Sequence, residues 1–440
     1  MTWIDDYRKR VTTAERAVEA VQSGDRVYLQ GGLPTPTVLI DALHARVGEL
    51  KDVEMMECLA MRKAFTGPEC VPHLRCNTFF VFGEMRKAVA EGRADYFPII
   101  FSRVEELFSS GRMPLDVAMI QAAPPDENGY LSMGIAVDMT HTAALSARQL
   151  IVEVNEQMPY TCGSYKLHVT QATAFVESSR PVLELPPMPV GDLHRRIAEH
   201  IEPLIPDGAT LQTGIGGVPD GVLACLGHKK NLGMHTEMFG DGAIPLIEAG
   251  VINNQAKTIN KGKLITSFVL GTKKIFDFVH RNPLIEFHPM RYVCDPYVIG
   301  QHDNMVAINS ALQVDLTGQV CSDSIGTTIY SGFGGQLDFI RGAGRSKGGR
   351  PILALPATAK DGAVSRIVPV LDPGSGVVVN RAEVHYVVTE YGVADLYGKT
   401  FRQRAEALIA IADPKFRDQL YDAAVKLRYL EPRMVGARSS

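Results

Sequence analysis

Glu237 is an acidic side chain in surroundings that suit a covalent nucleophile. His235 lies two residues before it, and apolar residues follow it directly. Two glycine-rich segments, 214–217 and 331–336, lie in the same half of the chain. A carboxylate beside apolar walls and backbone N–H donors can attack an electrophilic carbonyl carbon. A lone glutamate near a turn is more often a solvated surface residue, so the neighbouring segments decide between the two interpretations.

The first glycine segment consists of Gly214, Ile215, Gly216 and Gly217, between an expected strand and an expected helix. Backbone N–H groups at a helix N-terminus attract anions, and glycine lets a ligand approach closely. The segment lacks the GxGxxG spacing and a clear acidic ribose partner, which argues against a dinucleotide site. A tight turn that needs positive φ explains the same glycines, so both interpretations stay open.

The second segment places Ser331, Gly332, Gly334 and Gly335 before Gln336. A glycine loop can direct several N–H donors at one oxygen atom. A surface hinge would have the same composition, and the residue types do not separate the two.

No metal site is predicted. Cys70, His73 and Cys76 have a CxxHxxC spacing, but a fourth ligand is not evident, and loop residues beside a core explain them better. The seven cysteines are odd in number and contain no CxxC pair, which indicates reduced thiols rather than a disulfide framework.

The first elements of the chain indicate an open α/β sheet. Residues 26–30 are expected to form a strand, 31–36 a glycine turn, and 38–47 a helix. Further strands are expected at 53–56, 98–101, 117–121 and 150–154.

The second half of the chain repeats this pattern, which predicts an internal duplication. Residues 206–214 match 23–31 in kind, as a helix stop, a strand and a glycine turn. Later segments match in the same order: 315–320 with 126–131, and 386–390 with 150–154.

A proline-rich linker separates the two expected domains, because proline disfavours both helix and central strand. Ser178 to Val190 contains four prolines. We expect an N-terminal α/β domain over 1–185 and a C-terminal α/β domain over 191–440, which carries Glu237 and a last helix that begins at Asp413.

Composition excludes several other classes of protein. The net charge of −4 argues against a nucleic-acid binder, and the longest apolar runs are too short to span a membrane. The N-terminus lacks a basic region followed by an apolar core, so a cytoplasmic location is expected.

Five segments taken together resemble the acetyl-CoA hydrolase/transferase family, and within it the 4-hydroxybutyrate CoA-transferases and butyryl-CoA:acetate CoA-transferases. They are residues 211–220, 235–242, 322–326, 334–343 and 387–392. The resemblance extends from about Trp3 to about Phe416.

The resemblance implies two related α/β domains, usually in a homodimer, with Glu237 as the nucleophile. It also implies that both glycine segments contact coenzyme A and the acyl oxygen; these residues are Gly214, Ile215, Gly216, Gly217, Gly334, Gly335 and Gln336. Coenzyme A is then a substrate, an acyl-CoA and a short-chain carboxylate are the partners, and no tightly bound cofactor is expected.

The expected activity is ping-pong transfer of coenzyme A between a short-chain acyl-CoA and a carboxylate such as acetate, through a glutamyl-CoA thioester on Glu237. An acyl-CoA hydrolase, a transferase for a dicarboxylic acid such as itaconate or succinate, and a non-catalytic CoA-binding protein are the alternatives. Gly240 and Pro245 stand where family members often have Ser and Asp, which leaves the choice of acid open. Arg341 is either a ligand for a carboxylate or a CoA phosphate, or a surface residue.

Overall fold

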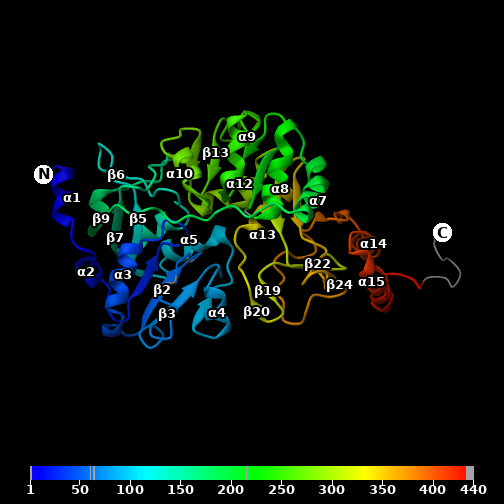
Figure 1. Ribbon diagram of the computed structural model, residues 1–440, viewed down its shortest axis with the longest axis horizontal. Helices are drawn as coiled ribbons and strands as arrows, with labels where there is room; N and C mark the ends of the chain where they lie inside the picture. The colour runs from blue at the N-terminus through cyan, green and yellow to red at the C-terminus, as the bar shows by residue number, and fades with distance from the viewer. Residues whose placement is uncertain (1, 60, 63–64, 215, 433–440) are drawn as a thin grey trace.

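The computed structural model describes residues 2–59, 61–62, 65–214 and 216–432. Two β-sheets lie side by side along the long axis of the molecule, with helix α1 (Trp3–Arg10) at one end and helix α15 (Pro414–Lys426) at the other (Figure 1). The predicted α/β fold class is confirmed.

The first sheet has seven parallel strands in the order β4-β3-β2-β1-β5-β7-β9. Its long strands are buried almost continuously, as expected for a parallel sheet with both faces covered. The strands are β1 (Arg26–Leu29), β2 (Val53–Glu57), β3 (Leu74–Thr78), β4 (Ala94–Tyr96), β5 (Leu115–Ala122), β7 (Ala147–Asn155) and β9 (Ala174–Ser178). The helices are α2 (Ala14–Ala17), α3 (Thr37–Ala45), α4 (Met85–Ala90), α5 (Phe101–Ser109) and α6 (Thr140–Ser146).

The second sheet has six strands in the order β11-β10-β16-β21-β25-β26, and only β26 runs antiparallel. The strands are β10 (Thr210–Thr213), β11 (Gly233–Met234), β16 (Met305–Ser310), β21 (Arg350–Ala354), β25 (Tyr386–Thr389) and β26 (Gly392–Asp395). The main helices are α7 (Asp192–Ile201), α8 (Gly217–Cys225), α9 (Ile244–Glu248), α10 (Lys273–Val279), α11 (Met290–Val293), α12 (Pro296–Gly300), α13 (Gln336–Arg345) and α14 (Phe401–Ala410).

The two halves share the turn that precedes their first strand. Gly24 and Gly208 have φ angles of 86° and 73°, a conformation that glycine adopts without strain. Each donates its N–H to a lysine carbonyl at 2.9 Å, Gly24 to Lys51 and Gly208 to Lys230. Strand β1 then lies between β2 and β5, and β10 between β11 and β16.

A second turn, after β5 and β16, is also the same in both halves. Asp126 Oδ1 accepts the N–H groups of the residues two and four positions later, at 3.0 and 2.9 Å, and Asp315 Oδ1 does so at 2.9 and 3.0 Å. Gly129 and Gly318, three positions later, have φ angles of 84° and 90°. The repeated hydrogen bonds support an internal duplication.

Two sequence expectations are wrong. The sheet order places β25 in the position of β9, and β21 in that of β7, so residues 386–390 do not correspond to 150–154. Residues 98–101 form no strand, because Phe101 begins α5 and buries its ring there. A short apolar run does not distinguish a strand from a buried helix segment.

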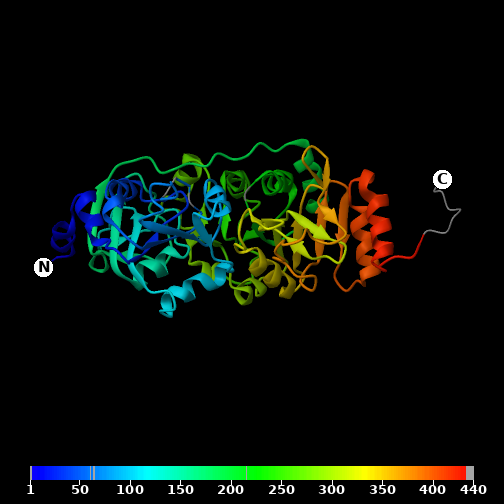
Figure 2. The ribbon, with the colours of Figure 1, turned by 90° about the horizontal axis from the view of Figure 1, so that it is seen from below.

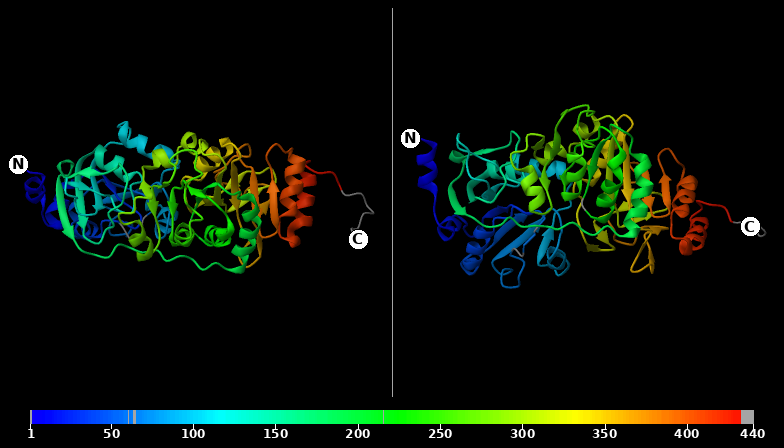
Figure 3. Two further views of the ribbon diagram at one scale, coloured as in Figure 1. Left: turned by 90° about the horizontal axis from the view of Figure 1, so that it is seen from above. Right: turned by 45° about the horizontal axis from the view of Figure 1, so that its top comes forward.

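The proline-rich segment between β9 and α7 runs along the outside of the molecule from one sheet to the other (Figures 2 and 3). It carries no helix or strand, and the N–H of Leu185 donates to the Gly271 carbonyl at 2.8 Å. The domain limits 1–185 and 191–440 stay a prediction.

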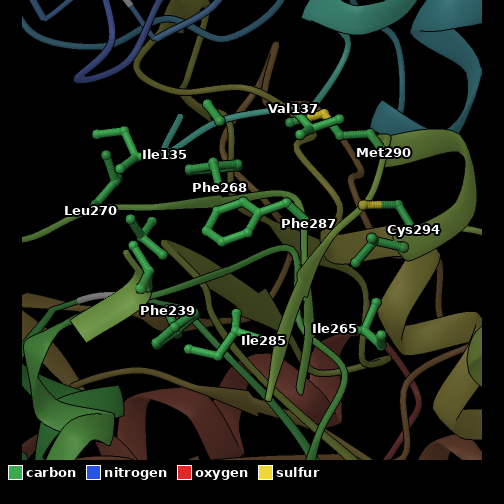
Figure 4. Close-up of a cluster of buried hydrophobic side chains, with 14 of the residues drawn as sticks. Ile135, Val137, Phe239, Ile265, Phe268, Leu270, Ile285, Phe287, Met290 and Cys294 are labelled. Atoms are coloured by element: carbon green, nitrogen blue, oxygen red, sulfur yellow. The ribbon is translucent and has the colours of Figure 1, made fainter. Parts of the chain in front are cut away.

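The two halves meet in a shared apolar core. The segment 135–137 of the first half lies against 267–269 of the second, with Val137 N–H 2.9 Å from the Ser267 carbonyl and Val269 N–H 3.0 Å from the Ile135 carbonyl. Figure 4 shows the side chains of Ile135 and Val137 beside Phe268 and its neighbours. This packing fixes the strands that carry the candidate site.

Candidate active site

A cavity of about 350 Å³ lies where the two halves meet, beyond the carboxyl ends of β10 and β16. Ligands in open α/β sheets bind in such crevices. The first half lines it mainly with apolar side chains: Leu59, Met61, Phe80, Phe82 and Phe101. The second half lines it with Glu237 and the loop 330–336, among other residues.

Glu237 follows β11 closely, and its backbone is fixed from two sides. Its carbonyl accepts the N–H groups of Ser267 at 3.0 Å and Phe268 at 3.2 Å. The preceding Thr236 hydroxyl lies 3.0 Å from the Thr213 carbonyl, at the end of β10. These contacts leave the half-buried carboxyl group in the wall of the cavity.

The second glycine segment touches the Glu237 carboxyl group. The backbone N–H of Gly335 donates to it, and a Cβ atom at Gly335 would lie only 2.2 Å from Glu237 Oε2. Gly334, with φ of 56°, gives the loop the turn that brings this N–H inward. On the other side, the Cys294 thiol donates to Glu237 Oε2 across 3.8 Å.

Burial raises the pKa of Glu237 to about 8, and the negative charge of Asp338 adds to this effect. The hydrogen bonds from Gly335 and Cys294 oppose it. Asp338, on α13, is itself buried, which raises its pKa to about 7 although Ser102 donates to it. A carboxyl group with a strongly raised pKa in a cleft is a candidate for chemistry.

The residues of the first glycine segment face different parts of the molecule. Gly214 lines the same cavity as Glu237, and Ile215 lies outside the described residues. Gly216, with φ of 115°, precedes α8 and faces a neighbouring cavity of about 280 Å³ against the proline-rich segment. Gly217 packs on α7, since a Cβ there would lie 2.2 Å from His194 Nδ1.

Gln336 begins α13 and also lines the cavity. Its Nε2 donates to the Ser310 carbonyl at 2.7 Å, at the end of β16. The structure therefore brings Gly214, Gly334, Gly335 and Gln336 to one cavity with Glu237. Their roles in binding stay a prediction.

The reasoning from sequence did not assign several polar lining residues to the site, among them Gln212, Asn309 and Arg86. Asn309 Nδ2 donates to Gln212 Oε1 at 2.9 Å, which joins the ends of β16 and β10. Arg86 lies on α4. A polar residue at the end of a buried strand is a signal that could have found Asn309, whereas Arg86 stands in no motif.

The residues at which the sequence leaves the choice of substrate acid open do not line the Glu237 cavity. Gly240 lines the neighbouring cavity, and Pro245 is exposed on α9. Arg341 Nε lies 3.2 Å from Glu383 Oε1 in a partly exposed ion pair, so it pairs with a carboxylate of its own chain.

Within the described ranges, no group of three or more His, Cys, Asp or Glu side chains is arranged to hold a metal ion. All seven cysteines are free thiols. Among the same residues, no helix has the length and apolar character needed to cross a membrane.

Comparison with known proteins places the chain in a family. The acetyl-CoA hydrolase/transferase N-terminal domain matches residues 2–188, and the C-terminal domain of the same name matches residues 271–424. A 4-hydroxybutyrate coenzyme A transferase of Clostridium kluyveri is 50% identical over 421 residues, which are 96% of this chain and 98% of that protein.

A succinyl-CoA:acetate/propanoyl-CoA:succinate CoA transferase of Fasciola hepatica is 44% identical, over 95% of this chain and 88% of that protein. The crystal structure of RipA from Yersinia pestis matches with a TM-score of 0.93 at 35% identity, over 98% of this chain and 100% of that chain. The resemblance seen in the five sequence segments is thereby confirmed, and the chain belongs to the acetyl-CoA hydrolase/transferase family.

Proposed function

We propose that this protein is a CoA-transferase in which Glu237 accepts coenzyme A from a short-chain acyl-CoA and passes it to a second carboxylate. The observation that carries the proposal is the contact between the Glu237 carboxyl group and the Gly335 N–H in the wall of a cavity shared by both halves. This contact joins a nucleophile to a donor for the charge that forms during the reaction.

The reaction proceeds by exchange of one acyl bond for another. The Glu237 carboxylate attacks the thioester carbonyl, the C–S bond breaks, and an acyl-glutamyl anhydride and CoA thiolate form. The thiolate attacks the glutamyl carbonyl and releases the first acid as its carboxylate. Glu237 then holds coenzyme A as a thioester.

The acceptor carboxylate reverses these steps. It attacks the glutamyl thioester carbonyl and expels CoA thiolate, which leaves an anhydride between the acceptor acid and Glu237. The thiolate attacks the acceptor's carbonyl, so that a new acyl-CoA departs and the free Glu237 carboxylate returns. One product leaves before the second substrate reacts, which gives ping-pong kinetics.

Each step passes through an oxyanion, for which the glycine loop supplies a donor. A well-placed N–H donor stabilises such a charge by about 2.7–4 kcal/mol. Gly335 suits this role because its lack of a side chain allows its N–H to reach the reacting carboxyl group. Remote contacts to coenzyme A would orient the thioester toward Glu237.

The substrates follow from the relatives. The 50% identity to a 4-hydroxybutyrate coenzyme A transferase supports 4-hydroxybutyryl-CoA as donor. A butyryl-CoA:acetate CoA-transferase of Anaerostipes caccae, 38% identical over 97% of this chain, supports butyryl-CoA as donor and acetate as acceptor. The Fasciola relative supports succinate as an alternative acid. We further propose that the protein works in the cytoplasm as a homodimer, with coenzyme A as a substrate rather than a resident cofactor.

A panel of acyl-CoA donors, each with and without acetate, tests the activity. Formation of acetyl-CoA that depends on acetate, without net release of thiol, is the expected result. Release of thiol without an acceptor would instead identify an acyl-CoA hydrolase. The donor with the highest kcat/KM names the preferred acid.

A further inference from the structure

Arg86 is the only cationic side chain among the described residues that line the Glu237 cavity. It lies on α4 of the first half and is half-buried. Its Nε donates to the Tyr330 carbonyl at 2.7 Å, and its guanidinium group lies 3.8 Å from the centre of the Tyr330 ring. The side chain is therefore held across the boundary between the halves.

The two terminal nitrogens of Arg86 have no carboxylate partner in the part of the chain that the structure describes. Two arginines of the second half are paired, by contrast: Arg291 with Glu105 at 3.5 Å, and Arg341 with Glu383 at 3.2 Å. An arginine fixed by stacking and one hydrogen bond keeps its remaining donors available in a planar fork.

The surroundings of Arg86 favour an anionic ligand. Phe80, Phe82 and Phe101 line the same cavity, so much of the wall near Arg86 is apolar. A guanidinium group in such a wall is stabilised most by a bidentate oxyanion, either a carboxylate or a phosphate.

We propose that Arg86 binds an oxyanion of the substrate at a distance from the reacting carbonyl, and so determines which acyl group or carrier the cavity accepts. The inference rests on the proposed function. The shared chemistry is a carboxylate or phosphate held by the guanidinium fork. Its source is either the distal carboxylate of a dicarboxylic acyl group or a phosphate of coenzyme A.

The anchoring of Arg86 also connects this ligand to the glycine loop. Tyr330, which accepts the Arg86 Nε–H, directly precedes Ser331 and the glycines that reach Glu237. An anion on the fork would thus be bound by a side chain of the first half that is anchored on the second-half loop carrying the Gly335 N–H.

The test compares Arg86→Gln and Arg86→Lys with the unchanged protein and with Lys87→Gln. Lys87 is exposed on the same helix, does not line the cavity, and lies 3.8 Å from Glu91. Steady-state kcat/KM is measured with butyryl-CoA and with butyryl-pantetheine, which lacks the phosphates, each with acetate and with succinate as acceptor.

We expect Arg86→Gln to lower kcat/KM by roughly 10- to 100-fold for the substrates that carry the recognised anion, as loss of charge-assisted hydrogen bonds predicts. If a CoA phosphate is bound, the loss appears with both acids and disappears with butyryl-pantetheine. If a distal carboxylate is bound, the loss appears with succinate and not with acetate. Arg86→Lys should retain part of the rate, and Lys87→Gln all of it.

An equal loss for all four substrate pairs, or a change below about 3-fold in each, would overturn the proposal. Calorimetric titration of coenzyme A and of succinate into the same variants separates this outcome from failure of the proposed function. Binding weakened by Arg86→Gln supports the site even if no transfer occurs, whereas unchanged binding of both ligands rejects it.

Discussion

Two equivalent positions, one in each half of the molecule, carry different residues. Strands β2 and β11 occupy equivalent places beside β1 and β10. Asp52 and Asn231 precede them and both have a φ angle of 56°. Six residues after each of these turns stands Cys58 in the first half and Glu237 in the second.

Cys58 lies in a position that suppresses its reactivity. Its side chain is 6% exposed, and burial raises the pKa of its thiol well above the ordinary value. A Cβ atom at Gly31 would lie only 1.6 Å from the Cys58 carbonyl oxygen, so the first glycine turn packs directly against the Cys58 backbone. A nucleophilic cysteine needs a lowered pKa and access, and Cys58 has neither.

Glu237 faces a cavity because the second half adds the loop 331–335 and α13, and because the first half covers them. The Phe101 N–H, at the start of α5, donates to the Gly334 carbonyl at 3.1 Å. The Ser102 hydroxyl donates to Asp338 at 2.8 Å. The comparison shows that duplication supplied two similar sheets, whereas the candidate site needs residues from both.

The largest expected effect is a difference in rate between variants of the two equivalent residues, Glu237 and Cys58. Glu237→Gln should lower kcat by roughly 10⁴-fold or more, because no covalent intermediate can form. Cys58→Ser should change kcat by less than about 3-fold. Steady-state rates of acyl transfer measure both, and equal losses in the two variants would contradict the comparison.

The next largest effect concerns the Gly335 N–H, a hydrogen-bond donor that only the second half possesses. Gly335→Ala places a Cβ against Glu237 Oε2, so the carboxyl group or the loop must shift and the contact between the Gly335 N–H and the carboxyl group is lost. We expect kcat to fall by about 10²–10³-fold. Gly227→Ala is the matched control, since a Cβ at Gly227 meets nothing within 4 Å.

The raised pKa of Glu237 predicts opposite pH effects on activity and on stability. Only the ionised carboxyl group attacks, so kcat/KM should rise with pH to a plateau above about 8. Folding favours the protonated form, so ionisation destabilises the protein between the ordinary pKa of 4.5 and about 8.

Thermal unfolding of Glu237→Gln should therefore match the unchanged protein below pH 4.5. The melting temperature of the variant should exceed that of the unchanged protein increasingly up to about pH 8, and by a constant amount above it. A difference in melting temperature that does not change with pH would show that Glu237 is not desolvated.

The smallest expected effect concerns the turn after β5 and β16, which the two halves share. Gly129→Ala and Gly318→Ala each force an L-residue into a turn with φ near 90°, which costs about 1 kcal/mol or more. Denaturant unfolding should show similar losses in both variants, with kcat unchanged. A loss of activity confined to Gly318→Ala would give that turn a role that its counterpart lacks.

Much of the fold could be predicted from sequence because the local signals agreed with it. Alternating glycine turns and buried strands indicated the α/β sheets, and the matches of 206–214 with 23–31 and of 315–320 with 126–131 predicted the duplication. The sequence order of strands did not reveal their order in the sheet, so residues 386–390 were matched to β7 rather than β9. That assignment depends on long-range pairing, which local patterns do not contain.

The candidate site was only partly predictable, for a similar reason. Glu237 and the glycines stand in recognisable segments. Arg86 reaches the cavity from α4. Cys294 reaches the Glu237 carboxyl group from the end of α11. Both residues are far from Glu237 in the sequence. Their side chains gain a function only through the packing of one half on the other.

A map of the covalent intermediate tests directly whether Glu237 is the nucleophile. The unchanged protein is incubated with butyryl-CoA in the absence of an acceptor, digested, and analysed by mass spectrometry. We expect coenzyme A to be attached to the peptide that contains Glu237, and the adduct to be released when acetate is added. A CoA adduct on a peptide lacking Glu237, such as the one that carries Cys58, would contradict this expectation.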